Sequence, residues 1–227
     1  FAQWDTALCT ALKIGGCMTK THDDELLALI ADMSESEIEQ FINSLDEDER
    51  AVISRILANA PVWFPLEGPQ MAAYTSDADI IGYGGAAGGG KTDLIAGLSL
   101  NVHKRVLIVR REKAQTDGIV QRIEEIVGHK NGYNTQKSAW RFDNGRLLEF
   151  GGLDNMGDEK RWQGRAHDLK ALDEATEIRE SQAMFVMGWN RTSDPTIKPK
   201  CLLTFNPPTT AEGRWVLDFF APWIKKG

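Results

Sequence analysis

The sequence predicts an α/β fold in which helices flank a mostly parallel central sheet, preceded by a small helical appendage. From residue 79 onwards, short apolar runs alternate with segments of helical periodicity, as in parallel strands joined by helical crossovers. Between residues 23 and 58 the periodicity is helical only, and acidic side chains dominate. We therefore expect a helical segment over 1–60 and an α/β domain over 61–227.

The chain has 227 residues and a net charge of −7, which is unevenly distributed. Between Met18 and Ala60, eleven acidic residues outnumber three basic ones, so the remainder is close to neutral. That remainder is compatible with DNA binding but contains no basic stripe that would predict it. No apolar run approaches the ~20 residues that span a bilayer, and Phe1–Cys17 lacks the features of a signal peptide, so we expect a cytoplasmic protein without a membrane partner.

Two or three small helices are expected within residues 23–58. Ser34 offers an N-cap ahead of an acidic first turn, and Asp46 offers a second one. The acidic face of these helices is typical of a solvated surface, with a docking surface as the alternative. Residues 1–17 differ from the rest of the chain, and Met18 resembles a natural start, so 1–17 is interpreted as an upstream extension.

Strands and helices alternate along the expected α/β domain, after a linker over 59–68 that contains Pro61 and Pro65. The expected strands are 79–84, 105–110, 168–173 and 200–205. The expected helices are 91–103, 116–127, 180–190 and 212–223. Two further strands, 138–142 and 146–151, flank Asp143-Asn144-Gly145, which is a strong signal for a β-hairpin turn.

A glycine-rich loop follows the first strand and reads Gly85-Ala86-Ala87-Gly88-Gly89-Gly90-Lys91-Thr92. It fits G-x-x-x-x-G-K-[ST], the phosphate-binding loop of P-loop NTPases. Glycines allow positive φ angles, so that successive N–H groups can point at phosphate oxygens. The Lys91 ammonium is expected to reach the β/γ-phosphates of ATP, and the Thr92 hydroxyl is expected to ligate Mg²⁺. A turn of small residues with a chance Gly-Lys-Thr is the alternative.

Two carboxylates, Asp173 and Glu174, end the strand 168–173. In a P-loop protein, a carboxylate at the end of the neighbouring strand helps to hold Mg²⁺, and Asp173 suits that role. Glu174 suits the orientation or deprotonation of the water that attacks the γ-phosphate. The alternative is a pair of acids that is stabilised by a helix N-terminus.

The last expected strand ends in Thr204 and Asn206. Their side chains are expected to emerge beside the phosphates, because open α/β sheets bind ligands at the carboxyl ends of their strands. This polar pair suits a sensor of the γ-phosphate. The alternative is an ordinary strand end in front of a Pro-Pro turn.

These motifs together resemble the large terminase subunit of tailed bacteriophages. The resemblance covers about 62–225 and rests on Gly-Gly-Ala-Ala-Gly-Gly-Gly-Lys-Thr, Leu-Asp-Glu-Ala-Thr, and Thr-Phe-Asn-Pro followed by Gly213-Arg214-Trp215-Val216. It implies an additional-strand, catalytic-glutamate P-loop ATPase that uses ATP and Mg²⁺ to pump double-stranded DNA into a procapsid. It also implies a homo-oligomeric ring, a portal protein and a small terminase subunit as partners, in the cytoplasm of an infected bacterium.

The resemblance also implies roles for single residues. Thr204 and Asn206 match the family's coupling motif. Gln70 matches a glutamine that reads adenine, with Phe64 or Tyr74 stacking on the base. Lys91, Thr92, Asp173 and Glu174 match family positions that bind phosphate, hold Mg²⁺ and activate water.

Two departures from the family affect what is expected. The family often has an arginine within the loop, where this chain has Ala86–Gly89, so an arginine finger must come from elsewhere. Arg161 and Arg165 are the candidates, and a neighbouring subunit can supply the one that acts. No second group of acids for two-metal cleavage is visible, so we expect this chain to lack the nuclease domain and assign it no nuclease activity.

The motifs leave other functions open. A helicase or recombination ATPase of the same deep class would lack the Thr-x-Asn-Pro and Gly-x-Trp elements. A small-molecule kinase is disfavoured because Glu174 favours water as the nucleophile. A nucleotide-dependent assembly module would bind ATP with little turnover when isolated.

Overall fold

A computed structural model describes residues 33–50, 61–86 and 88–224. The chain divides into two compact units, Phe1–Phe64 with Ile126–Gly128, and Pro65–Glu125 with His129–Gly227. The expected extension over 1–17, and the parts of the expected helices before residue 33 and after residue 50, lie outside the described residues. The expected domain boundary at residue 60 stays a prediction.

In the first unit, α3 spans Glu35–Ser44. Glu37 Oε2 accepts the Ser34 hydroxyl over 2.6 Å and the Ser34 backbone N–H over 2.7 Å, which is one half of a capping box. Asp46 and Glu49 make both halves: Asp46 Oδ1 accepts from Glu49 N over 2.8 Å, and Glu49 Oε2 accepts from Asp46 N over 3.0 Å. The predicted N-cap at Asp46 is therefore confirmed, and Ser34 directly precedes its helix as predicted.

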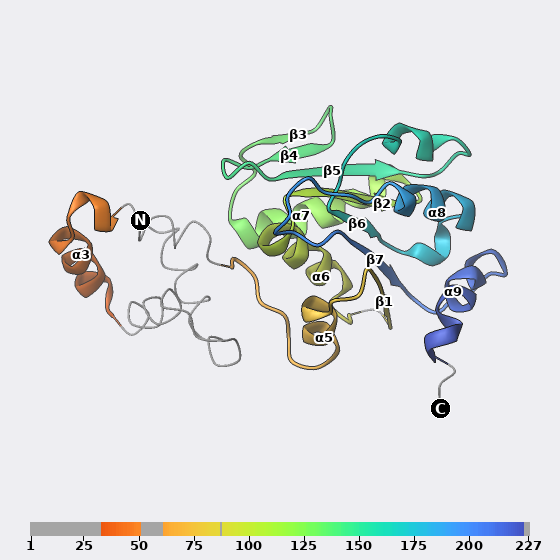
Figure 1. Ribbon diagram of the computed structural model, residues 1–227, viewed down its shortest axis with the longest axis horizontal. Helices are drawn as coiled ribbons and strands as arrows, with labels where there is room; N and C mark the ends of the chain where they lie inside the picture. Colours follow the sequence, from red (N-terminus) through yellow and green to blue (C-terminus); the bar gives the residue numbers. More distant parts are fainter. Residues whose placement is uncertain (1–32, 51–60, 87, 225–227) are drawn as a thin grey trace. The chain divides into compact units, whose positions relative to one another are not determined.

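The second unit contains a seven-stranded sheet in the order β1-β7-β6-β2-β5-β4-β3 (Figure 1). Five strands are parallel: β1 (Ile80–Gly84), β7 (Lys200–Phe205), β6 (Leu169–Leu172), β2 (Arg105–Arg110) and β5 (Leu147–Gly152). Two are antiparallel: β4 (Ala139–Arg141), which forms the predicted hairpin with β5, and β3 (Tyr133–Asn134), which was not predicted. The predicted mostly parallel sheet is confirmed.

One expectation about strand order is wrong. The strand that ends in Asp173 was expected beside the strand that enters the glycine-rich loop, but β7 lies between β6 and β1. The order of parallel strands depends on where each crossover returns to the sheet, and local sequence patterns do not carry that information.

The helices follow the predicted order with changes at their ends. The expected helix 91–103 is α6 (Lys91–Gly97) continued by a π-helical turn, η1 (Leu98–Val102). The others are α5 (Pro69–Thr75), which was not predicted, α7 (Asp117–Val127), α8 (Glu180–Gly188) and α9 (Trp215–Ile224). Short 3₁₀ turns are η2 (Lys113–Thr116), η3 (Asp158–Trp162), η4 (Ala175–Glu177) and η5 (Glu212–Arg214). Within the described residues, no helix is long and apolar enough to cross a membrane.

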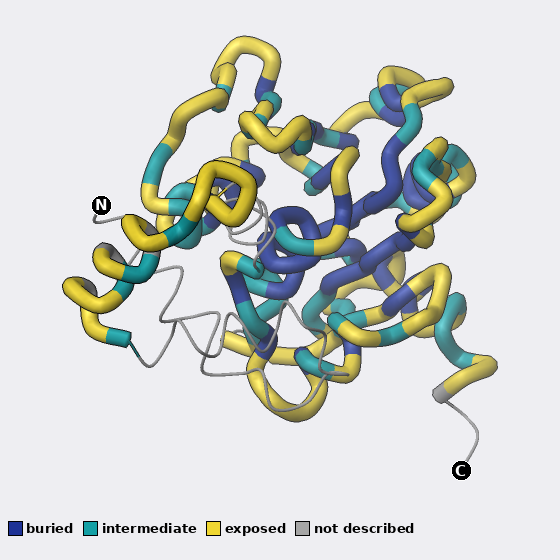
Figure 2. Tube along the Cα trace, turned by 60° about the vertical axis from the view of Figure 1, so that its left-hand side comes forward, coloured by how far each residue is buried: buried dark blue, intermediate teal, exposed yellow. Residues whose placement is uncertain are grey.

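The core lies around the central parallel strands. Four consecutive residues of β2, Val106 to Val109, are fully buried, as expected for a parallel strand that is covered on both faces. Packed against one face are α8 and α9, through side chains that include Ala183, Val186 and Val216. Figure 2 shows the buried segments gathered in the middle of this unit, with exposed loops around them.

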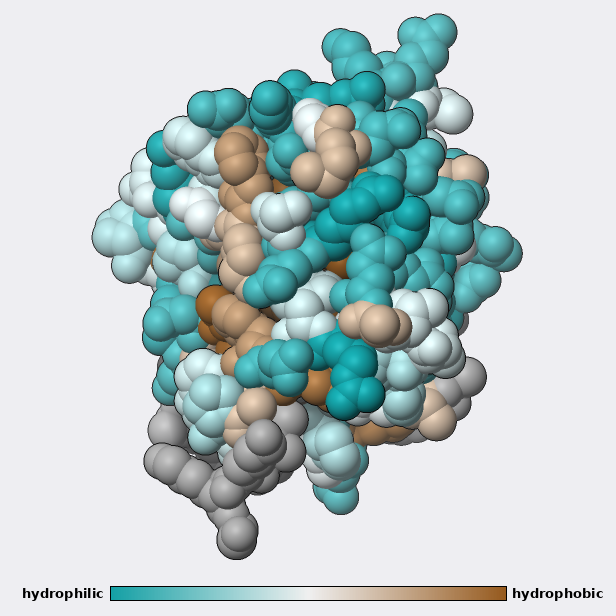
Figure 3. All heavy atoms as spheres, turned by 90° about the vertical axis from the view of Figure 1, so that its right-hand side faces the viewer, coloured by the Kyte–Doolittle hydropathy of each residue, from teal (hydrophilic) through white to brown (hydrophobic). Residues whose placement is uncertain are grey.

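Helix α9 brings aromatic side chains onto β1. Phe220 lies so close to Gly82 that a Cβ there would come within 2.8 Å of the ring, so this position requires glycine. Phe219 and Phe220 contact each other edge to face with ring centroids 5.0 Å apart. Trp223, at the end of the same helix, is 69% exposed. Figure 3 shows apolar patches among hydrophilic surface on the face where α8 and α9 lie.

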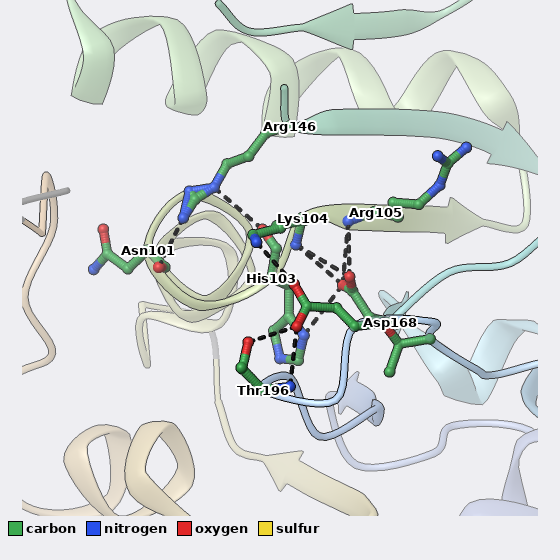
Figure 4. Close-up of polar contacts among 9 residues, drawn as sticks. Asn101, His103, Lys104, Arg105, Arg146, Asp168 and Thr196 are labelled. Carbon is green, nitrogen blue, oxygen red and sulfur yellow. Dashed lines mark hydrogen bonds and ion pairs between the residues drawn. The ribbon is translucent and has the colours of Figure 1, made fainter. Parts of the chain in front are cut away.

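A buried polar cluster joins the amino ends of β2 and β6 (Figure 4). Asp168, 2% exposed, accepts the backbone N–H groups of Lys104 and Arg105 over 3.1–3.2 Å. His103 Nδ1 lies 3.3 Å from Asp168 Oδ1. The guanidinium of Arg146 donates to the carbonyls that end the π-helical turn, those of Leu100, Asn101 and His103. The cluster therefore anchors the end of η1 and the start of β2.

Candidate functional site

Eight of the predicted site residues line one cavity of about 510 Å³ at the carboxyl edge of the sheet. Its walls are the loop between β1 and α6, residues at the ends of β2, β6 and β7, and one face of α7. The predicted residues in the lining are Gly88, Gly89, Gly90, Lys91, Thr92, Asp173, Glu174 and Asn206. Folding thus brings the three sequence motifs together at one place.

The glycine-rich loop is held by side chains from outside it. Gly88 and Gly90 have positive φ angles of 82° and 69°. The Tyr83 hydroxyl donates to Gly89 O over 3.0 Å, and Gln70 Nε2 donates to Gly90 O over 3.0 Å. These bonds fix two of the loop carbonyls without a ligand. Ala87, which was also predicted to bind phosphate, lies outside the described residues.

The Lys91 ammonium has an acceptor for each of its three N–H donors. It donates to Gly85 O over 2.9 Å, to Ala86 O over 2.8 Å and to Asn206 Oδ1 over 2.9 Å. An anion that binds Lys91 must therefore replace at least one of these partners. One of these partners, the side-chain amide of Asn206, directly follows the last strand.

Strand β7 connects the two halves of the site because it lies between β1 and β6. The Thr204 hydroxyl donates to Asp173 Oδ1 on one side, and Asn206 accepts from Lys91 on the other. Thr204 and Asp173 are both almost completely buried, at 0% and 1% exposed. Thr204 and Asn206 thus link Lys91, at the end of the glycine-rich loop, to Asp173, directly after β6.

The backbone of Glu174 is in the left-handed region, with φ 53° and ψ 48°. Non-glycine residues seldom adopt this conformation, and such positions cluster at functional sites. Burial raises the pKa of the Glu174 carboxyl, and the nearby Arg110 guanidinium partly opposes that rise. Glu174 and Asn206 also line an adjoining cavity of about 390 Å³, so the carboxylate stands between two solvent-accessible spaces.

Arg110 is a site residue that the sequence motifs did not reveal. Its Nε donates to Asp173 Oδ2 over 2.6 Å, its Nη2 to Glu174 Oε1 over 3.2 Å, and its Nη1 to Gln115 O over 3.3 Å. One guanidinium therefore bridges both carboxylates. The signal in the sequence was its position as the last residue of a buried apolar run, which places it at the carboxyl edge of a parallel sheet.

Gln70 lies beside the loop, but it is 4% exposed and does not line the cavity. Its Oε1 accepts the Leu66 backbone N–H over 2.6 Å while its Nε2 holds Gly90 O, so it connects the chain before α5 to the loop. The Tyr74 hydroxyl accepts from Asn101 Nδ2 over 3.2 Å. Phe64 belongs to the other unit. Adenine recognition by these residues stays a prediction.

Arg161 and Arg165 line a different cavity, of about 640 Å³, and not the one around the glycine loop. The Arg161 side chain is 74% exposed and lies 3.5 Å from Asp158. Arg165 is paired with Glu149 over 2.7 Å and lies over the Trp162 ring. Neither arginine reaches the site of its own chain, so any role in it requires a second subunit.

Comparison with known proteins identifies solved structures with this fold. No model of a protein family and no curated protein matches the chain. The large terminase of a thermophilic bacteriophage has a TM-score of 0.51 and 16% identity, over 70% of this chain and 44% of that chain. The bacteriophage HK97 large terminase has a TM-score of 0.45 and 14% identity, over 80% and 37%. The chain spans less than half the length of either neighbour. The first of these structures confirms the predicted resemblance to large terminases for the fold.

Proposed function

We propose that this chain contains the ATP-hydrolysing motor domain of a viral DNA-packaging terminase. One observation carries the proposal: a single cavity combines the Gly88–Thr92 loop with Asp173, Glu174 and Asn206. The strand order supports a P-loop NTPase of the additional-strand, catalytic-glutamate class, because β7 separates the strand before the loop from the strand before the two carboxylates. The fold shared with the large terminase of the thermophilic bacteriophage supports the packaging role.

Nucleotide binding starts at the loop and the N-terminus of α6. Backbone N–H groups at a helix N-terminus attract phosphate, and glycines allow it to approach closely. The Lys91 ammonium then donates to a phosphate oxygen in place of the Gly85 carbonyl or the Asn206 side chain. Asn206 directly follows β7, and Thr204 of the same strand holds Asp173. Loss of the hydrogen bond between Lys91 and Asn206 therefore couples nucleotide binding to β7.

The residues present fit a magnesium ion that arrives with ATP. Mg²⁺ in such sites is held by one or two protein oxygens together with substrate phosphates. The Thr92 hydroxyl and the Asp173 carboxylate, which line the same cavity, would hold the ion. Bound there, Mg²⁺ would neutralise charge on the β- and γ-phosphates.

Glu174 orients the attacking water and accepts its proton. A carboxylate whose pKa is raised by burial is a better base near neutral pH than an exposed one. In the structure this carboxylate is paired with Arg110, so the pair must loosen before the base acts. Glu174 also lines the adjoining cavity, which is large enough to hold water next to the carboxylate.

Nucleotide binding is tested with Lys91→Ala. A hundredfold excess of Mg²⁺-ATP over Kd should raise the free energy of unfolding of the wild type by about 2.7 kcal/mol. Lys91→Ala should lose that increase, whereas Lys160→Ala, which removes an exposed lysine outside the cavity, should keep it. A Lys91→Ala protein with an unchanged response would contradict the assignment.

The motor activity is tested by ATP turnover per chain at rising protein concentration, with and without duplex DNA. A ring in which Arg161 or Arg165 completes the site of the next subunit should show a steep rise, because such a finger contributes about 10³–10⁵ in rate. Mixing Lys91→Ala with an Arg161→Ala or Arg165→Ala protein should then restore turnover. Turnover that is independent of concentration would favour a self-sufficient helicase-type ATPase, and its absence in every assembled state would favour an assembly module.

A further inference from the structure

Two arginine side chains line the cavity, and they are held differently. All three guanidinium nitrogens of Arg110 have partners, and its side chain is 19% exposed. The Arg122 side chain is 40% exposed, and its Nη2 has no partner within the described residues. All guanidinium nitrogens of Arg110 are therefore engaged by acceptors of the chain, whereas Arg122 has N–H donors left for a ligand.

Arg122 lines the same cavity as the glycine-rich loop. Its Nε donates to Asp93 Oδ1 over 2.5 Å, and its Nη1 donates to Glu125 Oε2 over 2.9 Å. Asp93 lies in the first turn of α6, two residues after Lys91. The guanidinium is thus fixed next to the helix N-terminus at which a phosphate chain would bind. Asp93, Arg122 and Glu125 all line the cavity.

We infer that Arg122 binds the terminal phosphate of the nucleotide within the same chain, exchanging Asp93 for phosphate oxygens. This rests on the proposed function. A guanidinium binds two oxygens of one anion with a fixed geometry, and a terminal phosphate carries more negative charge than the carboxylate that it replaces. The glycine-rich loop contains no arginine, so Arg122 on α7 provides the guanidinium for the terminal phosphate.

This role differs from that of Arg161 and Arg165. Those two arginines lie outside the cavity of their own chain and would act only across a subunit boundary. Arg122 acts in a dilute, unassembled chain and distinguishes ATP from ADP there. Asp93 and Glu125 hold the side chain at the cavity before the nucleotide arrives, so little side-chain ordering remains for the binding step.

The test measures ATP and ADP affinity at a protein concentration at which the chain is monomeric. Arg122→Ala should weaken ATP by about tenfold to a hundredfold, the range for a charged hydrogen bond, and should change ADP by less than about twofold. Arg122→Lys keeps the charge without the two-pronged geometry and should recover only part of the ATP preference. Arg141→Ala removes an exposed arginine on β4, outside the cavity, and should match the wild type.

Each outcome has a defined meaning. Equal losses of ATP and ADP affinity, or no loss, would overturn the inference and leave the proposed function standing. If Arg122→Ala does not fold, Arg122→Lys alone decides the question through the ratio of the two affinities. A wild-type chain that binds neither nucleotide, as Lys91→Ala is expected to behave, would overturn the proposed function and this inference with it.

Discussion

The two ends of β6 carry similar residues in different surroundings. Asp168 precedes the strand and Asp173 follows it, and both are almost completely buried. Backbone N–H groups satisfy Asp168, and no side-chain rearrangement can replace them. Asp173 is satisfied by two side chains, those of Thr204 and Arg110, and it lines a cavity. Burial alone therefore does not distinguish the two acids; side-chain partners and an adjoining cavity do, and they make Asp173 the candidate site residue.

The largest expected effect is on ATP turnover, at the carboxyl end of β6. Glu174→Gln keeps the size and hydrogen-bonding capacity of the side chain but removes the base. ATP turnover should fall by roughly 10²–10⁴-fold while ATP affinity is retained. Steady-state hydrolysis and equilibrium binding measured on the same preparation separate the two effects. Loss of binding together with turnover would place Glu174 among the residues that hold the metal ion.

At the amino end of β6, we expect a substitution to lower folding stability and to leave ATP affinity unchanged. Asp168→Ala leaves the part-buried N–H groups of Lys104 and Arg105 without an acceptor and removes the carboxylate that lies 3.3 Å from His103 Nδ1. The free energy of unfolding should fall by roughly 2–6 kcal/mol, at about 1–3 kcal/mol for each of the two orphaned N–H groups. Chemical denaturation measures this loss. ATP affinity at a temperature where the variant is folded should match the wild type, and a clear fall would mean that the amino end is coupled to the site.

The contrast between the two ends also marks what could be predicted from sequence. β2 and β7 were predicted with their observed bounds, because each is an uninterrupted buried run. Lys91, Asp173 and Asn206 were predicted as site residues because each follows such a run or a glycine-rich loop. The short helix α5 was missed, since its seven residues begin after Gly68, at φ 94°, and show no helical periodicity.

Contacts across the sheet were beyond sequence reasoning. Arg110 reaches both carboxylates only because β2 pairs with β6, and Thr204 reaches Asp173 only because β7 lies on the other side of β6. Strand order is set by how the crossovers pack, which no local pattern records. The same limit explains why the sequence did not place Arg110 and Arg122 beside the glycine-rich loop.

Arg110 offers a finer test of the carboxyl end. Its positive charge lowers the pKa of Glu174, against the rise that burial causes. A base acts only when ionised, so turnover falls as the pH drops through its pKa. Arg110→Gln should therefore move the acid limb of the turnover profile to higher pH. The pH dependence of hydrolysis at saturating ATP checks this, and an unmoved acid limb would mean that another group is the titrating base.

The smallest expected effect lies between the two ends, at Lys170 in the middle of β6. Lys170 is fully buried, its Nζ donates to Val186 O over 2.6 Å, and burial lowers its pKa to about 8. The unfolded chain then binds more protons than the folded one above pH 8, so stability should rise with pH there, by about 1 kcal/mol between pH 8 and 9. Cys201 opposes this mainly above pH 9, because burial raises its thiol pKa to about 12. Denaturation of wild type and Lys170→Met at the two pH values isolates the effect, and equal pH responses would mean that Lys170 keeps its proton.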